Sequence, residues 1–433
     1  MSTTTLDLFD ALRKLGTPGE LRAAAEKGVA PARQPRVNGH VHLPPNFSAF
    51  TTAAQAVQLA ADQKVGVLGA SNYYDYRVYD DLTSECRRHG IFPLYGLEII
   101  ALIDELVRQK VKVNDPGNFG KMYICGKGIT RFVDQTPEAR RLLGLIRRND
   151  TLRMETMASR LAEIFAAHGV QTGLSAPAVI DRIVRRHQCP REWVCLQERH
   201  LAQAFQEVFF EKVKPEDRAK LLGEIFGAAT KAGPNEGVKV QNEIRTHLMK
   251  AGKPAFSEDT FVSFEQAYSL ILELGGIPCY PTLADGANPV CAYEDPVEKL
   301  IADLHARGVW TAELIPIRNK PEVLVHYAKS MRRAGLVLVG GTEHNTLDLL
   351  PIEPTCLAGA PVPQEIKDIF WEGACVFAAH QFLALHGECG FVDSAGRKNP
   401  AYKNDEDRIA AFRSLGAAVI EKYYRAVGRS PEL

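Results

Sequence analysis

Short apolar runs alternate with amphipathic stretches along two separate parts of the chain. The apolar runs, which we expect to be strands, are residues 37–43, 65–71, 92–100, 275–281, 309–316 and 336–345. The stretches with apolar residues every three or four positions, which we expect to be helices, are residues 53–63, 79–90, 264–275, 297–308 and 322–335. Strands that alternate with helices form βαβ units around a parallel sheet. The pattern therefore predicts an α/β fold.

The block between these two parts has a different pattern. Residues 101–130 contain Pro116 and several glycines, so we expect them to be irregular. From about residue 137 to residue 255, apolar residues recur at helical spacing. The chain is thus predicted to begin with a helical extension, residues 1–34, and to end with a last helix, residues 396–433. Between them we expect a barrel made of residues 35–100 and 258–395, split by a mostly helical insertion of residues 101–257.

Composition narrows the class of protein. The chain has 433 residues with 52 basic and 52 acidic side chains, so its formal net charge is zero. This balance argues against a binder of long nucleic acid and favours a small-molecule substrate. The nine cysteines contain no C-x-x-C spacing and indicate thiols in a reducing compartment. No segment is as apolar as a secretory signal or a membrane span requires, so we expect a cytoplasmic protein, and a homo-oligomer stays open.

The sharpest chemical pattern is His40-Val41-His42 at the end of the first predicted strand. Residues two apart on a strand point to the same face, so the two imidazoles can meet one metal ion. Other candidate ligands also stand at predicted strand ends, namely Glu98, Glu313, Glu343 and His344. Residues at the carboxyl ends of parallel barrel strands converge on one mouth. The alternative is that His40 and His42 are ordinary polar residues of a loop.

These motifs resemble the PHP family, the polymerase and histidinol phosphatase metal-dependent phosphoesterases. That family opens with H-x-H, a T-D-H strand end and G-x-E, and it later carries A-H-P and G-S-D-x-H. The chain has NGHVHL at the opening and GLE at residues 96–98, with GGIPCYP and GGTEHN where the two later motifs would stand. The resemblance covers about residues 36–100 and 260–347. It implies a distorted TIM-like (β/α)7 barrel of PHP type with a metal-dependent phosphoesterase site.

Carried over by position, His40 and His42 match the first two metal ligands of the family and Glu98 matches its bridging carboxylate. The other positions depart from the family pattern: Ser71-Asn72-Tyr73 stands at T-D-H, Tyr280 replaces a histidine, Glu343 replaces the aspartate, and Asn345 stands at the last histidine unless His344 serves. Amides and phenols are weak ligands, so a site for three metals is not expected. The resemblance implies one or more zinc, manganese or iron ions, held by His40, His42, Glu98 and either Glu343 or His344. Asp75 would restore a carboxylate if its loop bends.

The same resemblance suggests roles around the metal. We expect Glu343 or His344 to orient or deprotonate the attacking water. We expect Tyr73 or Tyr280 to donate a hydrogen bond or, where the metal lowers the pKa of the phenol, to bind the metal as a phenolate. The expected substrate contacts are Arg318, His200 and Lys127. His200 lies in QERHLAQAF, which is similar to an R-x-H-x-A element of some nucleotide-hydrolysing members, although a polar residue of an amphipathic helix would look the same.

Three functions follow from this interpretation. The first is a metal-dependent hydrolase of a small substrate, most simply a phosphoesterase, in which a metal-bound hydroxide attacks at the barrel mouth. The second is a degenerate barrel that keeps a partial metal site and acts as a binding or regulatory protein. The third is an amidohydrolase or lyase that uses Tyr280 as its acid.

Overall fold

The computed structural model of the protein describes residues 8–258 and 260–429. The first seven residues of the predicted extension, and residues 430–433 of the predicted last helix, lie outside the described residues. Among the helices that are described, none is long and apolar enough to cross a membrane.

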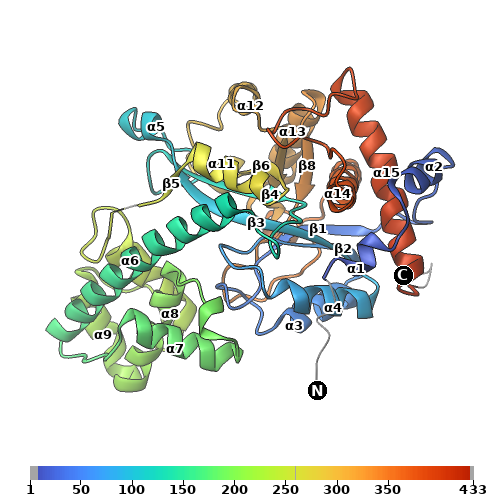
Figure 1. Cartoon of the computed structure of the whole chain (residues 1–433). Coiled ribbons are helices and arrows are strands. Elements are labelled where there is room, and N and C mark those ends of the chain that lie inside the picture. Colours follow the sequence, from blue (N-terminus) through green and yellow to red (C-terminus); the bar gives the residue numbers. More distant parts are fainter. Residues whose placement is uncertain (1–7, 259, 430–433) are drawn as a thin grey trace.

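One sheet curves into a nearly closed barrel (Figure 1). Its strands follow each other in the order β1 (Arg36–Val41), β2 (Val65–Ala70), β3 (Phe92–Leu102), β4 (Lys121–Lys127), β6 (Ile277–Thr282), β7 (Thr311–Leu314) and β8 (Val337–Gly340), and β5 (Val262–Ser263) pairs with β3. The barrel closes at its mouth, where the backbone N–H of His42 donates to the carbonyl of Glu343 over 2.8 Å. The predicted distorted TIM-like α/β barrel is confirmed.

The expectation of an irregular segment at residues 101–130 is wrong, because this segment contains β4. The strand runs antiparallel to both of its neighbours, β3 and β6, whereas the other pairs along the barrel are parallel. It begins with Lys121 and ends with Lys127, and both lysines are buried in ion pairs. A strand with a lysine at each end and glycines beside it does not form the continuous apolar run from which the other strands are predicted.

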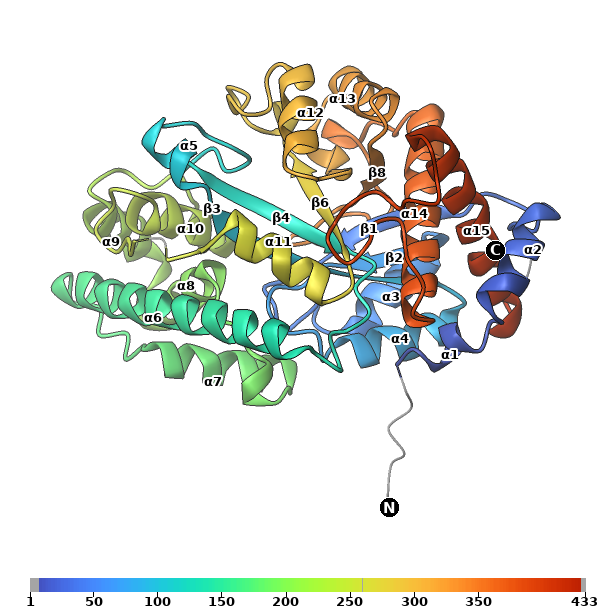
Figure 2. The ribbon, with the colours of Figure 1, turned by 45° about the horizontal axis from the view of Figure 1, so that its top comes forward.

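Helices cover the outside of the barrel (Figure 2). Those between the strands are α3 (Ala53–Asp62), α4 (Tyr79–His89), α5 (Asp104–Arg108), α11 (Phe264–Glu273), α12 (Val297–Ala306) and α13 (Pro321–Arg333). The helix α14 (Gln364–Leu385) also packs directly on the sheet, against β8 and β1. Further out, α1 (Asp10–Arg13) and α15 (Asp405–Ala426) pack against α14, and α2 (Pro18–Glu26) packs against α15. The helix α14 was not predicted from the sequence pattern. It lies between β8 and α15 and is buried on nearly every side, so it has no polar face.

The insertion is a helical bundle beside the barrel mouth (Figures 1 and 2). Its helices are α6 (Pro137–Ala167), α7 (Ala176–His187), α8 (Glu198–Lys212), α9 (Pro215–Phe226) and α10 (Gly237–Ile244), and α10 continues as a π-helical turn, Arg245–Met249. Short 3₁₀ turns lie at Arg191–Trp193, Ala284–Gly286, Pro316–Arg318 and Leu357–Gly359. The bundle has its own apolar core, which is separate from the core around the sheet.

Polar contacts fasten the bundle to the barrel mouth, and two of them join α6 and the start of α8 to the loops after β2 and β1. The backbone N–H of Phe47, in the loop after β1, donates to Oε1 of Gln197 over 2.6 Å. Nη1 of Arg147 on α6 lies 3.0 Å from Oδ2 of Asp75 in the loop after β2. The first residues of α8 are thereby held over the open end of the barrel.

Candidate metal centre and cavity

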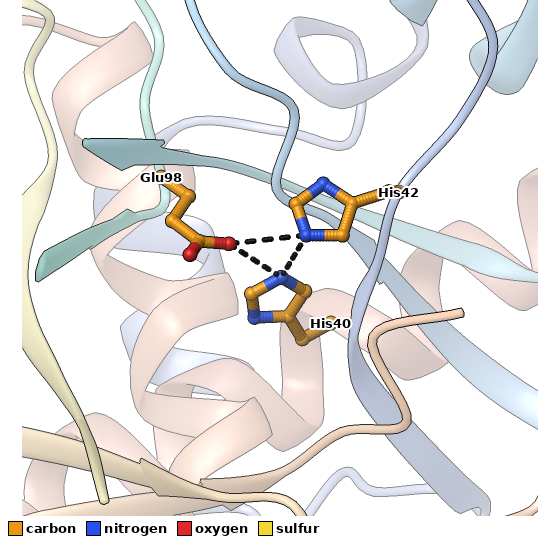
Figure 3. A group of neighbouring side chains, drawn as sticks. All are labelled: His40, His42 and Glu98. Atoms are coloured by element: carbon orange, nitrogen blue, oxygen red, sulfur yellow. Dashed lines mark hydrogen bonds and ion pairs between the residues drawn. The ribbon is translucent and has the colours of Figure 1, made fainter. Parts of the chain in front are cut away.

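Three buried donor atoms meet at the mouth of the barrel. His40 and His42 extend from the end of β1, and Glu98 comes from β3 (Figure 3). The two Nε2 atoms are 3.2 Å apart, and Oε2 of Glu98 lies 3.4 Å from Nε2 of His40 and 3.0 Å from Nε2 of His42. The sequence analysis predicted that these three residues would converge, and the structure brings them together.

The spacing of these atoms fits a divalent metal ion. Ligands held about 2.0 Å from zinc at the corners of a tetrahedron lie about 3.3 Å from each other. The three distances of 3.0, 3.2 and 3.4 Å bracket that value. In the part of the chain that the structure describes, the buried Oε2 of Glu98 has no hydrogen-bond partner beyond its contacts with the two imidazoles. Imidazole and carboxylate are the donors that zinc, manganese and iron accept.

Tyr73 holds the carboxylate in place. Its hydroxyl donates to Oε1 of Glu98 over 2.8 Å, so Oε2 is the oxygen that faces the two histidines. The ring of Tyr73 stacks on the ring of His42, with centroids 5.2 Å apart. Burial, and then the charge of Glu98, raise the pKa of Tyr73 well above its ordinary value. Tyr73 is therefore a neutral hydrogen-bond donor.

His40 and Glu98 favour opposite charges, His40 the protonated form and Glu98 the ionised form. Burial of the His40 ring opposes its protonation, but the charge and hydrogen bond of Glu313 outweigh burial and raise the pKa of His40 to about 9. Burial likewise opposes ionisation of Glu98, but hydrogen bonds from His40 and His42 hold the pKa of this carboxyl far below its ordinary value. An arriving metal ion would thus take the place of a proton on His40.

A cavity of about 580 Å³ opens directly above the centre. Glu98, Tyr73 and Glu343 belong to its barrel side, and residues of the helical insertion form the opposite wall. Its volume suits a small molecule. Glu98 therefore places the candidate metal centre at the floor of a cavity between the barrel and the helical insertion.

Glu343 and Arg318 form the rim of this cavity. The guanidinium of Arg318 donates two hydrogen bonds to the carboxylate of Glu343. Nη1 donates to Oε1 over 2.9 Å, and Nη2 donates to Oε2. Nδ2 of Asn345 donates to the same carboxylate over 2.6 Å. Glu343 does not belong to either group of candidate ligands whose donor atoms lie within 4.8 Å of one another. The structure places Glu343 in the lining of the cavity and does not group it with the three donor atoms of the centre.

The insertion contributes positive charges that the sequence analysis missed. Arg199 at the start of α8, Arg245 on the π-helical turn and Lys250 all line the cavity. Arg199 and Lys250 form no ion pair with any described side chain, and the closest carboxylate of Arg245 is Glu198 at 3.9 Å. Burial and the neighbouring Arg245 lower the pKa of Arg199 to about 10. Because these residues belong to a separate bundle, no local pattern connects them with the barrel mouth.

His344 and Tyr280 point away from the cavity. Nδ1 of His344 lies 2.7 Å from the hydroxyl of Thr342 and Nε2 lies 2.9 Å from the carbonyl of Leu350, so both ring nitrogens have structural partners. The hydroxyl of the wholly buried Tyr280 donates to Oε1 of Glu294 over 2.9 Å. Neither residue lines the cavity. The expected catalytic roles of His344 and Tyr280 therefore have no support in the geometry.

His200 and Lys127 do not line the cavity either. Nδ1 of the buried His200 accepts from the backbone N–H of Gln197 over 3.1 Å and caps α8. Burial lowers the pKa of His200 to about 3, so it is neutral. Lys127 lies behind His40, where its ammonium is 2.5 Å from Oε2 of Glu313. The expected substrate contacts of His200 and Lys127 have no support in the geometry, because His200 bonds to the backbone of Gln197 and Lys127 pairs with Glu313.

The departures from the family motif have structural roles. The amide of Asn72 pairs with the backbone of Leu43 in both directions, each bond measuring 2.8 Å. Asp75 is held by Arg147 and by Arg77, so it does not restore a carboxylate to the centre. The amide of Asn72 thus fixes the loop that follows His42.

Comparisons with known proteins find resemblance only among solved structures. No family model and no curated protein matches the sequence. An amidohydrolase from Chromobacterium violaceum, solved with sulfate and without metal, aligns at a TM-score of 0.49 with 18% identity, over 77% of this chain and 96% of its own. A protein from Bifidobacterium adolescentis described as a metal-dependent phosphoesterase aligns at a TM-score of 0.49 with 13% identity, over the same shares of the two chains. At this distance the comparisons assign no ligand or substrate to the chain.

Proposed function

We propose that the protein is a metal-dependent hydrolase of a small anionic substrate, and that the bond it cleaves is a phosphoester. The observation that carries this proposal is the triangle of His40, His42 and Glu98 at the floor of the cavity. A divalent metal bound by these three residues supplies Lewis acidity and lowers the pKa of a water molecule.

The residues of the chain have distinct tasks in this proposal. Tyr73 keeps the carboxylate of Glu98 turned toward the histidines. Glu343, with both oxygens held by Arg318 and Asn345, accepts a hydrogen bond from the attacking water and orients it. The carboxylates on the barrel side are paired, whereas Arg199 and Lys250 on the insertion side form no ion pair with any described side chain. These cationic donors favour an anionic substrate, and a phosphate matches several of them at once.

The experiment is a screen of small phosphomonoesters, phosphodiesters and amides against the protein treated with a chelator and then supplied with zinc, manganese or iron. We expect phosphate release that depends on the added metal, that is lost in His42→Ala and that persists in His326→Ala, a control at an exposed histidine of α13. A protein that binds metal but cleaves none of these classes would contradict the proposal.

A second candidate function is a binding protein that keeps the barrel and one metal ion. The observation that favours it is the structural use of two positions where the family pattern has metal ligands, Asn72 and Tyr280. This candidate predicts that phosphate compounds bind in the cavity and leave unchanged.

A further inference from the structure

A second carboxylate lies directly behind the metal centre. Glu313 on β7 is wholly buried, and its Oε1 lies 2.8 Å from Nδ1 of His40. The thiol of Cys125 on β4 donates to the same oxygen over 2.9 Å. The other ring nitrogen of His40, Nε2, faces Glu98 and His42. Glu313 therefore contacts the side of His40 that is turned away from the cavity.

Lys127 on β4 neutralises this carboxylate inside the barrel. Its buried ammonium is surrounded by three oxygens, Oε2 of Glu313 at 2.5 Å, the hydroxyl of Ser71 at 3.0 Å and the carbonyl of Gly39 at 3.1 Å. Residues two apart on a strand point to the same face, so Cys125 and Lys127 both reach Glu313 from the antiparallel strand β4. A buried carboxylate needs such a partner, because an unpaired charge in the interior is strongly destabilising.

The arrangement also closes a second place where a metal could bind. Nδ1 of His40, Sγ of Cys125 and a carboxylate oxygen of Glu313 lie within 4.8 Å of one another and form a second group of candidate ligands. The ammonium of Lys127 is already in contact with Glu313, however, and a metal ion there would place two cations side by side. The thiol and Nδ1 are both used as hydrogen-bond partners of Oε1.

We propose that Glu313 is a positioning residue for the metal centre and that Lys127 is its fixed counter-ion. Glu313 accepts a hydrogen bond from the Nδ1–H group of His40 and so leaves Nε2 as the atom that binds metal, because the hydrogen bond at one ring nitrogen decides which tautomer is present. Lys127 holds Glu313 in this orientation and keeps the group behind His40 free of a second ion. The inference rests on the proposed function in one respect, that the metal is held by Nε2 of His40.

Two double variants isolate the contact between Glu313 and His40. Glu313→Gln with Lys127→Met removes both buried charges and keeps an acceptor for His40. Glu313→Leu with Lys127→Met removes the same charges and the acceptor as well. The probe is Co²⁺, followed by its ligand-field absorption and by calorimetry, with the thermal midpoint recorded for each protein.

We expect one cobalt ion per chain in the wild type and an affinity within about five-fold of it in the Gln variant. The Leu variant should bind about 10 to 100 times more weakly, as is usual for a lost partner of a ligating histidine, and its cobalt absorption should change although its thermal midpoint matches that of the Gln variant. Equal cobalt affinity and equal spectra in the two variants would overturn the inference, and so would a second cobalt ion in the wild type.

Nitrogen-15 spectra of the histidine rings give a test that needs no variant to fold. In the wild type we expect a proton on Nδ1 of His40 both with and without metal, and an Nδ1 without a proton would overturn the inference. A wild type that binds no cobalt would contradict the proposed function, and the Nδ1 proton would still decide whether Glu313 positions His40.

Discussion

The hydroxyl of Tyr73 donates a hydrogen bond of 2.8 Å to Oε1 of Glu98, and the second oxygen of the carboxylate consequently faces His40 and His42. A phenol thus stands where the family pattern would place a metal-ligating histidine. In this position Tyr73 orients the carboxylate of Glu98.

Replacing Tyr73 by Phe removes this hydrogen bond and keeps the ring that stacks on His42. We expect zinc affinity, measured by calorimetry, to fall about ten-fold, as for other partners that orient a ligating carboxylate. The thermal midpoint of the metal-free protein should change little, because the aromatic packing is kept. An unchanged affinity would mean that Glu98 is held without Tyr73.

Glu343 should contribute little to metal binding. Because Arg318 and Asn345 occupy its carboxylate, we expect Glu343→Gln to change zinc affinity by less than about three-fold, whereas Glu98→Gln should weaken it by at least about 100-fold. Parallel titrations of the two variants measure this difference. A comparable loss in both variants would show that Glu343 is a ligand after all.

The insertion should bind an anion even without metal. We expect inorganic phosphate to bind the wild type in the presence of a chelator, and Arg199→Gln to weaken this binding by about ten-fold or more, because a charged donor of the cavity is lost. Arg185→Gln, at an exposed arginine of α7, changes the net charge equally and is the matched control. Equal weakening in both variants would point to long-range charge instead of a site.

Glu294 should make folding stability depend on pH. Burial outweighs the hydrogen bonds from Leu283, Tyr280 and Ala284, and it raises the pKa of this carboxyl from 4.5 to about 7. The folded state therefore holds the proton more tightly than the unfolded state. The stability from this proton is complete below about pH 4.5 and is lost as the pH rises through 7, a difference of about 3 kcal/mol at most.

The check is urea unfolding of the wild type and of Glu294→Gln at pH 5 and at pH 8. The amide cannot titrate, so the free energy of unfolding of the wild type should fall relative to the variant between these two values. A difference between the two proteins that stays constant with pH would show that Glu294 is ionised throughout.

The barrel and the centre of the site could be predicted because their patterns are local. His40 and His42 stand two apart at a strand end, and Glu98 follows a buried apolar run. The sequence alone could not decide whether Glu343 or His344 faces the barrel mouth. Both have positive φ, 57° and 51°, so the two-residue alternation of a strand does not continue through them. That backbone turns Glu343 toward the cavity and leaves His344 packed on Phe50.

Contacts between distant segments could not be predicted from the sequence. From the sequence, Lys127 is expected to be a substrate contact, because no local pattern connects it with its partner Glu313, 186 positions further along the chain. Arg199 and Arg245 reach the cavity only because the insertion folds back over the barrel mouth. Such pairings depend on tertiary packing, which hydrophobic periodicity does not encode.

The most direct test of the central claim is the metal content of the protein, purified without added metal and measured by elemental mass spectrometry beside His40→Ala and Glu98→Ala. The account predicts about one equivalent of zinc, manganese or iron in the wild type and a loss of this metal in both variants. A well-folded wild type that carries no metal, and that takes up none when it is supplied, would contradict it.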